Sequence, residues 1–236
     1  MFSYNTNVRY SEVDCNKKMT IPAIINYLQD TCVFHSEEVG AGLDYVEKVE
    51  RVWMLGAWRI EFLKDIDFLD EIKLSTWPYA FKAFMGYRNL TIERNGEMCV
   101  RADSAWMLYS IKDKRLVKAQ EADIEYYPCE PALEMEKVNR KLNAPDNMGK
   151  KQSIVVTNSF IDTNGHVNNG KYIQIAIDAI DNVNFGSRIS VLEAEYKKQA
   201  MLNDIIIPYT AVSEREVFVS LKAEDDSVFA NIKFTF

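Results

Sequence analysis

The chain contains an internal duplication, and this constrains its fold more than any other feature of the sequence. A strand, a polar loop with Asp-x-Asn, a helix and four strands are predicted within residues 2–110 and again within 153–236. The aligned pairs are Asp14 with Asp162 and Asn16 with Asn164 at an offset of 148, and Leu69 with Leu202 at an offset of 133. The pattern predicts two copies of one structural unit.

In the first half, a capped helix precedes the strands. Thr20 can cap this helix, with Pro22 in its first turn. An apolar stripe at helical spacing consists of Ile21, Ile24, Ile25, Leu28 and Cys32. Strands are predicted at 53–63, 72–79, 84–93 and 98–110, after a first strand near residues 2–10. Asn95-Gly96 between the last two strands is a strong hairpin signal.

The second half repeats this order. Its predicted elements are a strand at 153–161, a helix from Lys171 to about Asp181, and strands at 190–196, 205–213, 217–223 and 228–236. A long helix followed by antiparallel strands predicts an α+β unit whose sheet wraps the helix, and two such sheets can join side by side. We therefore predict an N-terminal unit at 1–111, a linker at 112–152 and a C-terminal unit at 153–236.

Composition and motif scans exclude several classes of protein. The 28 basic and 35 acidic residues give a net charge of −7, which argues against a nucleic-acid-binding protein. No apolar run is long enough to span a membrane, and no signal peptide is visible. Four widely spaced cysteines predict a reduced, cytoplasmic protein without a zinc site. Nucleotide-binding and α/β-hydrolase motifs are absent, so we expect no cofactor and no metal.

The segment Ile161–Tyr172 concentrates the residues that can perform chemistry. Its polar members are Asp162, Asn164, His166, Asn168 and Asn169, directly before the second helix. Asn168 and Asn169 are candidate substrate-binding residues, and either can cap the helix. The helix N-terminus can polarise a carbonyl oxygen, and the imidazole can act as acid or base. The segment suits hydrolysis of an activated acyl group, although Asp and Asn before a helix are also common structural caps.

The first copy of the loop lacks the histidine, because Lys18 aligns with His166. One active site per chain is therefore expected, with the Asp-x-Asn element structural in both halves. His35 is interpreted as structural because the matching region of the second copy carries no chemistry, and Cys15 because no histidine lies near it in the sequence. Trp53, Met54 and Trp58 lie on a predicted strand and are candidates for contact with a flexible, apolar substrate chain, although most such residues are core.

The second loop resembles a motif of the acyl–acyl carrier protein thioesterases of plants and bacteria. The motif reads D-x-N-x-H-V-N-N-x-K-Y from Asp162 to Tyr172, and residues 192–200 resemble the family stretch L-x-x-E-Y-R-R-E-C. The resemblance implies a tandem pair of hotdog units, with Asp162, Asn164 and His166 as catalytic residues. The chain departs from the plant pattern with Gln199 and Ala200 in place of Glu and Cys.

The resemblance further implies release of a free fatty acid from an acyl carrier protein. Our mechanistic hypothesis is that His166 activates a water directly or through Asp162, and that Asp162 orients His166. Asn164 and helix N–H groups would hold the thioester oxygen, and Gln199 would place the water. Basic residues that could dock the acidic carrier are Lys137, Arg140, Lys141, Lys150, Lys151, Lys197 and Lys198. A coenzyme A thioesterase, a hotdog dehydratase and a non-catalytic acyl-thioester-binding protein remain alternatives. A monomer is feasible, because one chain holds both units, and a homodimer is also compatible.

Overall fold

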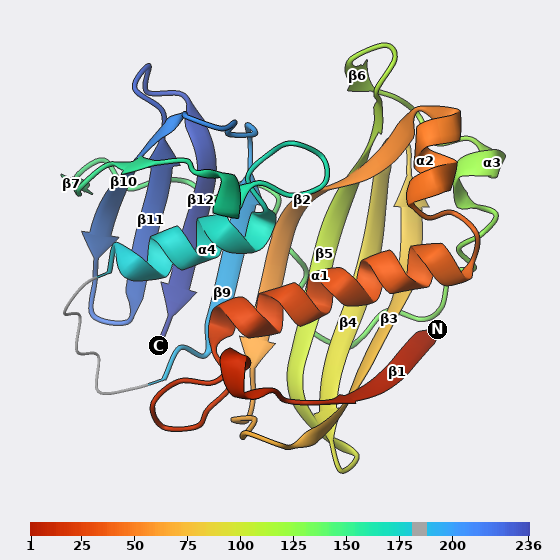
Figure 1. The fold of residues 1–236 in the computed structure, drawn as a ribbon, viewed down its shortest axis with the longest axis horizontal. Coiled ribbons are helices and arrows are strands. Elements are labelled where there is room, and N and C mark those ends of the chain that lie inside the picture. Colours follow the sequence, from red (N-terminus) through yellow and green to blue (C-terminus); the bar gives the residue numbers. More distant parts are fainter. Residues whose placement is uncertain (181–187) are drawn as a thin grey trace. The chain divides into compact units, whose positions relative to one another are not determined.

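The chain folds into two compact units in a computed structural model that describes residues 1–180 and 188–236 (Figure 1). The first unit comprises Met1–Gly56 and Ile60–Val138, and the second comprises Ala57–Arg59 and Asn139–Phe236. In each unit one helix lies across one face of a sheet (Figure 1). This arrangement confirms the predicted α+β class.

The first unit contains a sheet in the order β1-β3-β4-β5-β2, with β6 beside β5. Its elements are β1 (Phe2–Asn7), α1 (Ile21–Glu38), α2 (Leu43–Val49), β2 (Arg51–Phe62), β3 (Glu71–Lys82), β4 (Met85–Arg94), β5 (Glu97–Ser110), β6 (Arg115–Leu116) and α3 (Glu121–Ile124). The predicted hairpin turn is confirmed, because Asn95 and Gly96 both have positive φ and Arg94 pairs with Glu97.

Helix α1 begins where the sequence predicts. The Thr20 side chain accepts a hydrogen bond from the Ala23 N–H at 3.3 Å, and Pro22 occupies the first turn, where it costs no backbone bond. The predicted apolar stripe faces the sheet: Ile25 and Leu28 are almost fully buried. Burial of this stripe stabilises the helix against the sheet.

The second unit contains a sheet in the order β9-β12-β11-β10-β7, with β8 beside β10. Its elements are β7 (Gly149–Lys150), β8 (Ile154–Val155), α4 (Asn169–Asp178), β9 (Val191–Tyr196), β10 (Ile205–Val212), β11 (Glu216–Lys222) and β12 (Val228–Thr235). The predicted end of the helix at Asp181 lies outside the described residues.

The predicted strand at 153–161 is wrong over most of its length. Only Ile154–Val155 is a strand, and Asn158–Phe160 forms a 3₁₀ turn. Asn and Ser favour turns because their side chains bond nearby backbone groups, and this preference outweighs the apolar residues around them. The turn directs the chain into the polar loop before α4.

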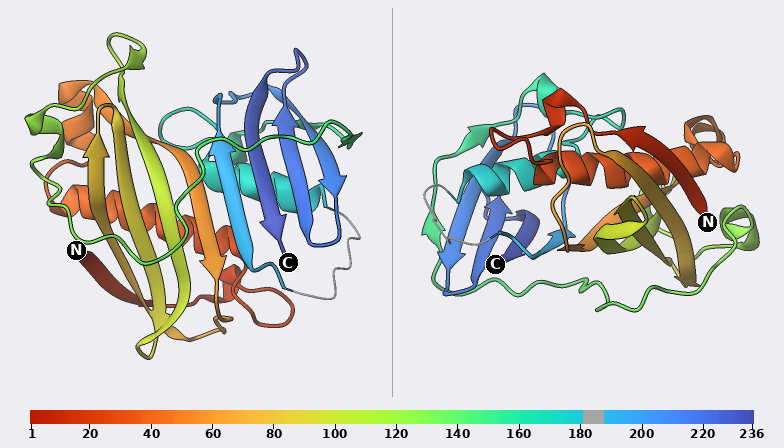
Figure 2. Two further views of the ribbon diagram at one scale, coloured as in Figure 1. Left: turned by 180° about the vertical axis from the view of Figure 1, so that it is seen from behind. Right: turned by 90° about the horizontal axis from the view of Figure 1, so that it is seen from below.

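Part of the predicted linker is a strap, defined here as residues 130–142, which crosses the sheet face opposite the helix (Figure 2). In the first unit, Asn89 on β4 lies opposite Asp103 on β5 and donates to it at 3.3 Å. The Asn89 side-chain oxygen Oδ1 accepts from the Leu133 N–H at 2.9 Å, and the Asp103 carboxylate accepts from the Val138 N–H at 2.9 Å. These buried polar side chains therefore satisfy the strap's backbone.

The second unit also holds the strap with an amide–acid pair, but here the Asn231 amide donates to the Leu142 carbonyl at 3.3 Å. Asn231 on β12 lies opposite Glu195 on β9 and donates to its carboxylate at 3.3 Å. That carboxylate accepts from the Leu142 N–H at 3.0 Å. Alternation correctly predicts that Asn231 points away from the apolar face of β12, yet Asn231 is only 2% exposed because the strap covers it. A strand pattern alone cannot distinguish a solvated polar face from one covered by a later segment.

Candidate active site

The His166 loop, defined as residues 162–168, connects the 3₁₀ turn to α4 in the second unit. The Asp162 N–H donates to the His166 carbonyl at 2.9 Å, and the Gly165 N–H donates to the Asp162 carbonyl at 3.0 Å. Gly165 has a φ of 77°, a conformation that glycine adopts without steric cost. These bonds close the loop on itself and fix the backbone that carries His166.

The first unit contains the same loop, built with the same bonds. At the offset of 148, the two backbone bonds described above are matched by Asp14 N–H to Lys18 carbonyl (2.8 Å) and Lys17 N–H to Asp14 carbonyl (3.0 Å). A third bond also occurs in both loops. It joins Asn16 N–H to Asp14 Oδ1 (2.8 Å) in the first and Asn164 N–H to Asp162 Oδ1 (2.8 Å) in the second. An isolated bridge joins Val13 to Met19 in one loop and Ile161 to Val167 in the other. The Asp-x-Asn element therefore shapes the backbone in both units, as expected.

The second predicted offset is wrong by one residue. The Met19 N–H donates to the Ile66 carbonyl at 2.8 Å, and the matching Val167 N–H donates to the Ala200 carbonyl at 3.0 Å, which gives an offset of 134. The left-handed residue of the following turn is Leu69 in one unit and Asn203 in the other, with φ of 68° and 71°. The predicted alignment paired Leu69 with Leu202 because the residues are identical, whereas the geometry of the turn pairs Leu69 with Asn203.

His166 is partly buried, and its ring has one unsatisfied atom. The buried Nδ1 has no hydrogen-bond partner within the described ranges 1–180 and 188–236. The Asp162 carboxylate instead accepts from the Asn164 N–H at 2.8 Å. The Asp162 carboxylate therefore holds the backbone of the loop, and the Asn164 side chain extends from the loop into solvent. A buried nitrogen in this state is a site at which a reactant or a water can bind.

The segment that follows β9 lies beside the His166 loop. The Ala200 carbonyl accepts from the Val167 N–H, one residue after the histidine. Gln199, which precedes Ala200, is exposed. The structure thus brings the segment that contains Gln199 to the loop. Ala200 is fully buried and offers only a methyl group, so this position holds no nucleophile.

Asn168 and Asn169 mark the start of α4. The Asn168 side chain accepts from the Gly170 N–H at 2.8 Å and caps the helix. The Asn169 carbonyl accepts from the Tyr196 hydroxyl at 3.1 Å. The positive end of the helix dipole is therefore next to His166, where it favours negative charge on a bound oxygen.

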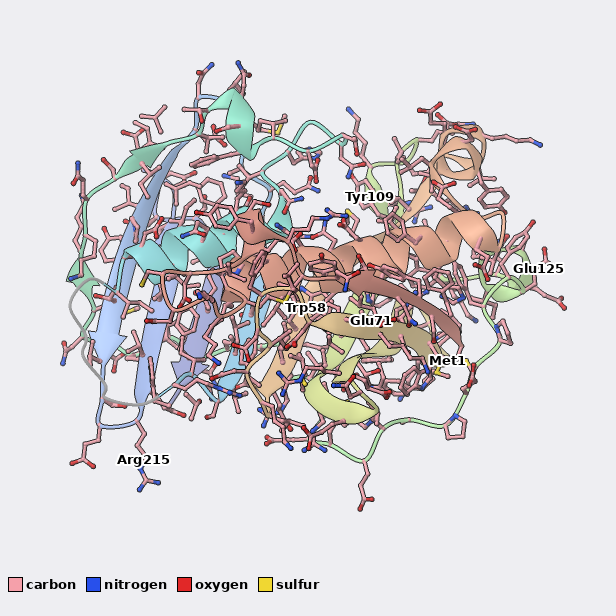
Figure 3. All side chains as sticks on the ribbon, turned by 60° about the horizontal axis from the view of Figure 1, so that its bottom comes forward. Met1, Trp58, Glu71, Tyr109, Glu125 and Arg215 are labelled. Atoms are coloured by element: carbon pink, nitrogen blue, oxygen red, sulfur yellow. The ribbon has the colours of Figure 1, made fainter. Side chains whose placement is uncertain are left out.

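The three candidates for acyl contact have different surroundings. The partly buried Trp53 donates from Nε1 to the Asp123 carbonyl at 3.4 Å, and its ring packs 5.5 Å from that of Phe81. Met54 is also partly buried and, like Trp53, belongs to the first unit. Trp58 belongs to the second unit, is fully buried and lies among packed side chains, whereas Arg215 extends outward (Figure 3). Trp58 is thus a core residue.

Lys18 and Cys15 show how the first loop differs from the second. The Lys18 ammonium lies 2.6 Å from the Asp67 carboxylate, so the residue that replaces His166 is held in an ion pair. At the offset of 134, the position of Asp67 is taken by Met201 in the second unit. Cys15 is exposed and its thiol is free. The first loop therefore carries a charge pair in place of the imidazole.

His35 is buried in a polar cluster of the first unit. Its Nδ1 lies 3.0 Å from Nη1 of Arg88, and its ring stacks on Phe2 and meets the edge of Tyr127. Burial first, and then the Arg88 charge, lower the pKa of His35 to about 4. The residue is therefore neutral near pH 7, with Nδ1 accepting from the guanidinium.

The buried state of His35 predicts a pH dependence of stability. Because its pKa is lowered from 6.5 to about 4, His35 stabilises the fold fully above pH 6.5 and progressively less as pH falls toward 4. The loss attributable to this residue is about 3 kcal/mol. Unfolding by urea across this range should show a steeper fall for the wild type than for His35→Gln, whose side chain does not titrate. Parallel curves for the two proteins would contradict this assignment.

Tyr172 and Tyr196 are the site residues that sequence reasoning missed. The Tyr172 hydroxyl accepts from the Ala200 N–H at 2.8 Å, and the two tyrosine rings lie 5.9 Å apart. Tyr172 is the last residue of the motif, but the motif does not predict the hydrogen-bond partner of the Tyr172 hydroxyl. The available signal was the duplication, which aligns these residues with Ile24 and Phe62, neither of which has a hydroxyl.

The described residues contain no cluster of three or more His, Cys, Asp or Glu side chains that could hold a metal ion. Among the helices in the same part of the chain, none combines the length and apolarity required to cross a bilayer.

The helix-on-sheet units, each introduced by the same polar loop, define a pair of hotdog units. The family model described as the acyl-ACP thioesterase N-terminal domain matches residues 1–127, and that described as the C-terminal domain matches residues 143–233. The chain belongs to the acyl-ACP thioesterase family.

Relatives and solved structures agree with this membership. The chain is 26% identical over 228 residues to oleoyl-acyl carrier protein thioesterase 2 of Arabidopsis thaliana, covering 87% of this chain and 62% of that protein. An acyl-ACP thioesterase from Bacteroides thetaiotaomicron superposes with a TM-score of 0.90 at 22% identity, covering 100% of this chain and 97% of the other. The 12:0-ACP thioesterase of Umbellularia californica gives 0.84 at 20% identity, with coverage of 99% and 96%. The solved structures establish the shared fold.

Proposed function

We propose that the chain hydrolyses the thioester between a fatty acyl group and an acyl carrier protein. Family membership supports the reaction class, and the observation that carries the proposal is the setting of His166. Its buried Nδ1 has no partner in the described part of the chain, and it lies in a loop bonded to the Gln199–Ala200 segment at the start of α4. An acid–base group, a neutral amide and a helix N-terminus therefore occur together.

In the proposed reaction, the His166 imidazole accepts a proton from water as the oxygen attacks the thioester carbonyl carbon. The carbonyl carbon becomes tetrahedral, and the carbonyl oxygen takes up the π electron pair of the carbon–oxygen double bond as an oxyanion. The oxyanion collapses, the carbon–sulfur bond breaks, and the imidazolium returns the proton to the leaving thiolate. The products are a fatty acid and the free thiol of the carrier, so protons and electrons balance.

The other predicted residues have supporting roles in this proposal. Asn164, which is exposed beside the loop, can donate its amide to the developing oxyanion. The Gln199 amide can place the water, although it cannot take the water's proton. Asp162 orients His166 through the loop backbone that it holds. The Asn168 cap and the first turn of α4, including Asn169, would contact the substrate carbonyl.

Trp53 and Met54 remain our candidates for contact with the acyl chain. Both are partly buried on β2, and the unbranched Met54 side chain can adapt to a flexible ligand. Full burial of Trp58 supports a core role for that residue instead. Chain-length profiles of Trp53→Ala and Met54→Ala are the measurements that address the two candidates.

The experiment that tests the function is an assay of purified protein against a panel of acyl-ACP and acyl-coenzyme A thioesters, from short to long chains. Released fatty acid and free thiol should appear in equal amounts with acyl-ACP. Preference for coenzyme A esters would favour the coenzyme A thioesterase alternative. Formation of an unsaturated acyl thioester from a hydroxyacyl substrate would indicate a dehydratase, and tight binding without turnover would indicate a binding protein.

Carrier docking predicts a dependence on ionic strength. Lys197 and Lys198 follow β9 beside Gln199, and both are exposed, with carboxylates of Glu195 and Asp225 at 3.6 Å and 3.9 Å. The Lys198–Asp225 pair is exposed and contributes at most ~1 kcal/mol, so an acidic carrier could displace it, whereas the Glu195 carboxylate beside Lys197 is buried. We expect kcat/KM for acyl-ACP to fall several-fold as salt is raised, and that for the matching coenzyme A ester to fall less. Equal responses would argue against a basic docking surface.

The compartment and assembly remain proposals. All four cysteines are free thiols, and Cys32 and Cys99 are buried, which is compatible with a reducing cytoplasm. Two hotdog units in one chain support a monomer, and a homodimer is the alternative. Size-exclusion chromatography with light scattering distinguishes the two.

A further inference from the structure

The two units provide an internal comparison of an active loop with an inactive one. Both loops share their backbone bonds, so those bonds cannot explain why chemistry is expected in only one. The informative differences are side chains at matching positions. Lys18 aligns with His166, Ile24 with Tyr172, and Phe62 with Tyr196. The second unit has thus gained an imidazole and two hydroxyls around one loop.

The Tyr172 hydroxyl connects α4 to Ala200, in the segment that follows β9. The Tyr172 hydroxyl accepts from the Ala200 N–H at 2.8 Å, in a position that is 2% exposed. The Ala200 carbonyl then accepts from the Val167 N–H at 3.0 Å. Both polar groups of the Ala200 backbone are therefore fixed, one by the helix and the other by the loop that carries His166.

The second hydroxyl supports the first. The Tyr196 hydroxyl donates to the Asn169 carbonyl at 3.1 Å, and its ring packs against that of Tyr172. Burial raises the pKa of Tyr172 to about 12, so its hydroxyl stays protonated at ordinary pH. The Tyr172 oxygen accepts the bond from the Ala200 N–H, so the bond itself does not depend on the hydroxyl proton.

We infer that Tyr172 is a positioning residue that, by holding the Ala200 amide, sets the Gln199 side chain against His166. This inference rests on the proposed hydrolysis and adds a residue that acts through another. The matching Ile24 cannot make the bond, in agreement with the absence of histidine from the first loop. Misplacement of a reacting group by about 1 Å can cost about 10²-fold in rate, so a single buried bond can have a large effect.

The test is Tyr172→Phe, which removes one oxygen and keeps the ring. We expect kcat to fall about 10-fold to 100-fold, with KM changed by less than about 3-fold, because the substrate still binds while Gln199 is misplaced. The matched control is Tyr127→Phe, which removes a buried hydroxyl that donates to Ser36 at 2.8 Å in the first unit. This control should keep wild-type kcat at a comparable change in melting temperature.

A double-mutant cycle separates positioning from general loss of stability. In a Gln199→Ala background, Tyr172→Phe should lower kcat by less than about 2-fold, because its route to the reaction has been removed. An undiminished effect in that background would overturn the inference, as would wild-type kcat for Tyr172→Phe alone. Absence of turnover by the wild type on every thioester would instead refute the proposed function, and the inference with it.

Discussion

His166→Ala should lower kcat for acyl-ACP hydrolysis by about 10²-fold to 10⁴-fold, the range typical of a lost general acid–base group. The substitution removes the imidazole without touching the backbone bonds that close the loop, because those bonds run between main-chain atoms and the Asp162 carboxylate. Circular dichroism and the unfolding midpoint should therefore remain close to wild type. Single-turnover measurement of released fatty acid gives the size of the loss.

The duplication supplies a matched control for this experiment. Lys18→Ala truncates the corresponding residue of the first loop and removes only its ion pair with Asp67. Because that pair is largely exposed, stability should change by no more than ~1 kcal/mol, and turnover should be unaffected. If a folded His166→Ala protein retained near-normal turnover, the imidazole could not be the acid–base group.

Trp58→Ala should lower the free energy of unfolding by about 3–5 kcal/mol, as expected for removal of a fully buried indole from a packed core. The neighbouring backbone can collapse only partly into the space, so both the lost burial and the remaining cavity contribute. Equilibrium denaturation in urea measures the loss. Turnover per folded molecule should be retained below the unfolding transition.

Trp53→Ala is the contrasting variant from the same strand. Trp53 is only partly buried, so its truncation should destabilise the protein less than that of Trp58. If it contacts the acyl chain, the chain-length profile should also change. Wild-type stability of Trp58→Ala would show that the indole is not a core residue.

Much of the fold could be predicted because its strongest signals are local. The Thr20 cap, the apolar stripe of α1 and the Asn95-Gly96 hairpin each depend on residues close in sequence, and the structure bears them out. The duplication then predicts the second unit from the first. The strand expected at 153–161 failed because turn-forming side chains near Asn158 outweighed the apolar pattern.

The site was predictable in its parts but only partly in its connections. The loop, the His166 position and the nearby Gln199 segment follow from the motif and the repeat. The bond between Tyr172 and Ala200 joins residues 28 positions apart and carries no local pattern. The carboxylate of Asp162 was expected to orient the imidazole directly, whereas the structure gives it the Asn164 amide as a partner. The same sequence of polar residues is compatible with several arrangements of hydrogen bonds.

The strap has a consequence for how such a chain could arise and be divided. Each unit contains a buried amide–acid pair that is hydrogen-bonded to the backbone of the intervening segment. Asn89 Oδ1 and the Asp103 carboxylate accept from it in the first unit, whereas in the second the Glu195 carboxylate accepts from it and the Asn231 amide donates to it. Separated at that segment, either half would have to hydrate these groups or lose a hydrogen-bonded covering over its sheet. Fusion of two ancestral gene copies would therefore have become hard to reverse once the strap had formed these bonds. Independent expression of the halves would then expose the amide–acid pairs to solvent.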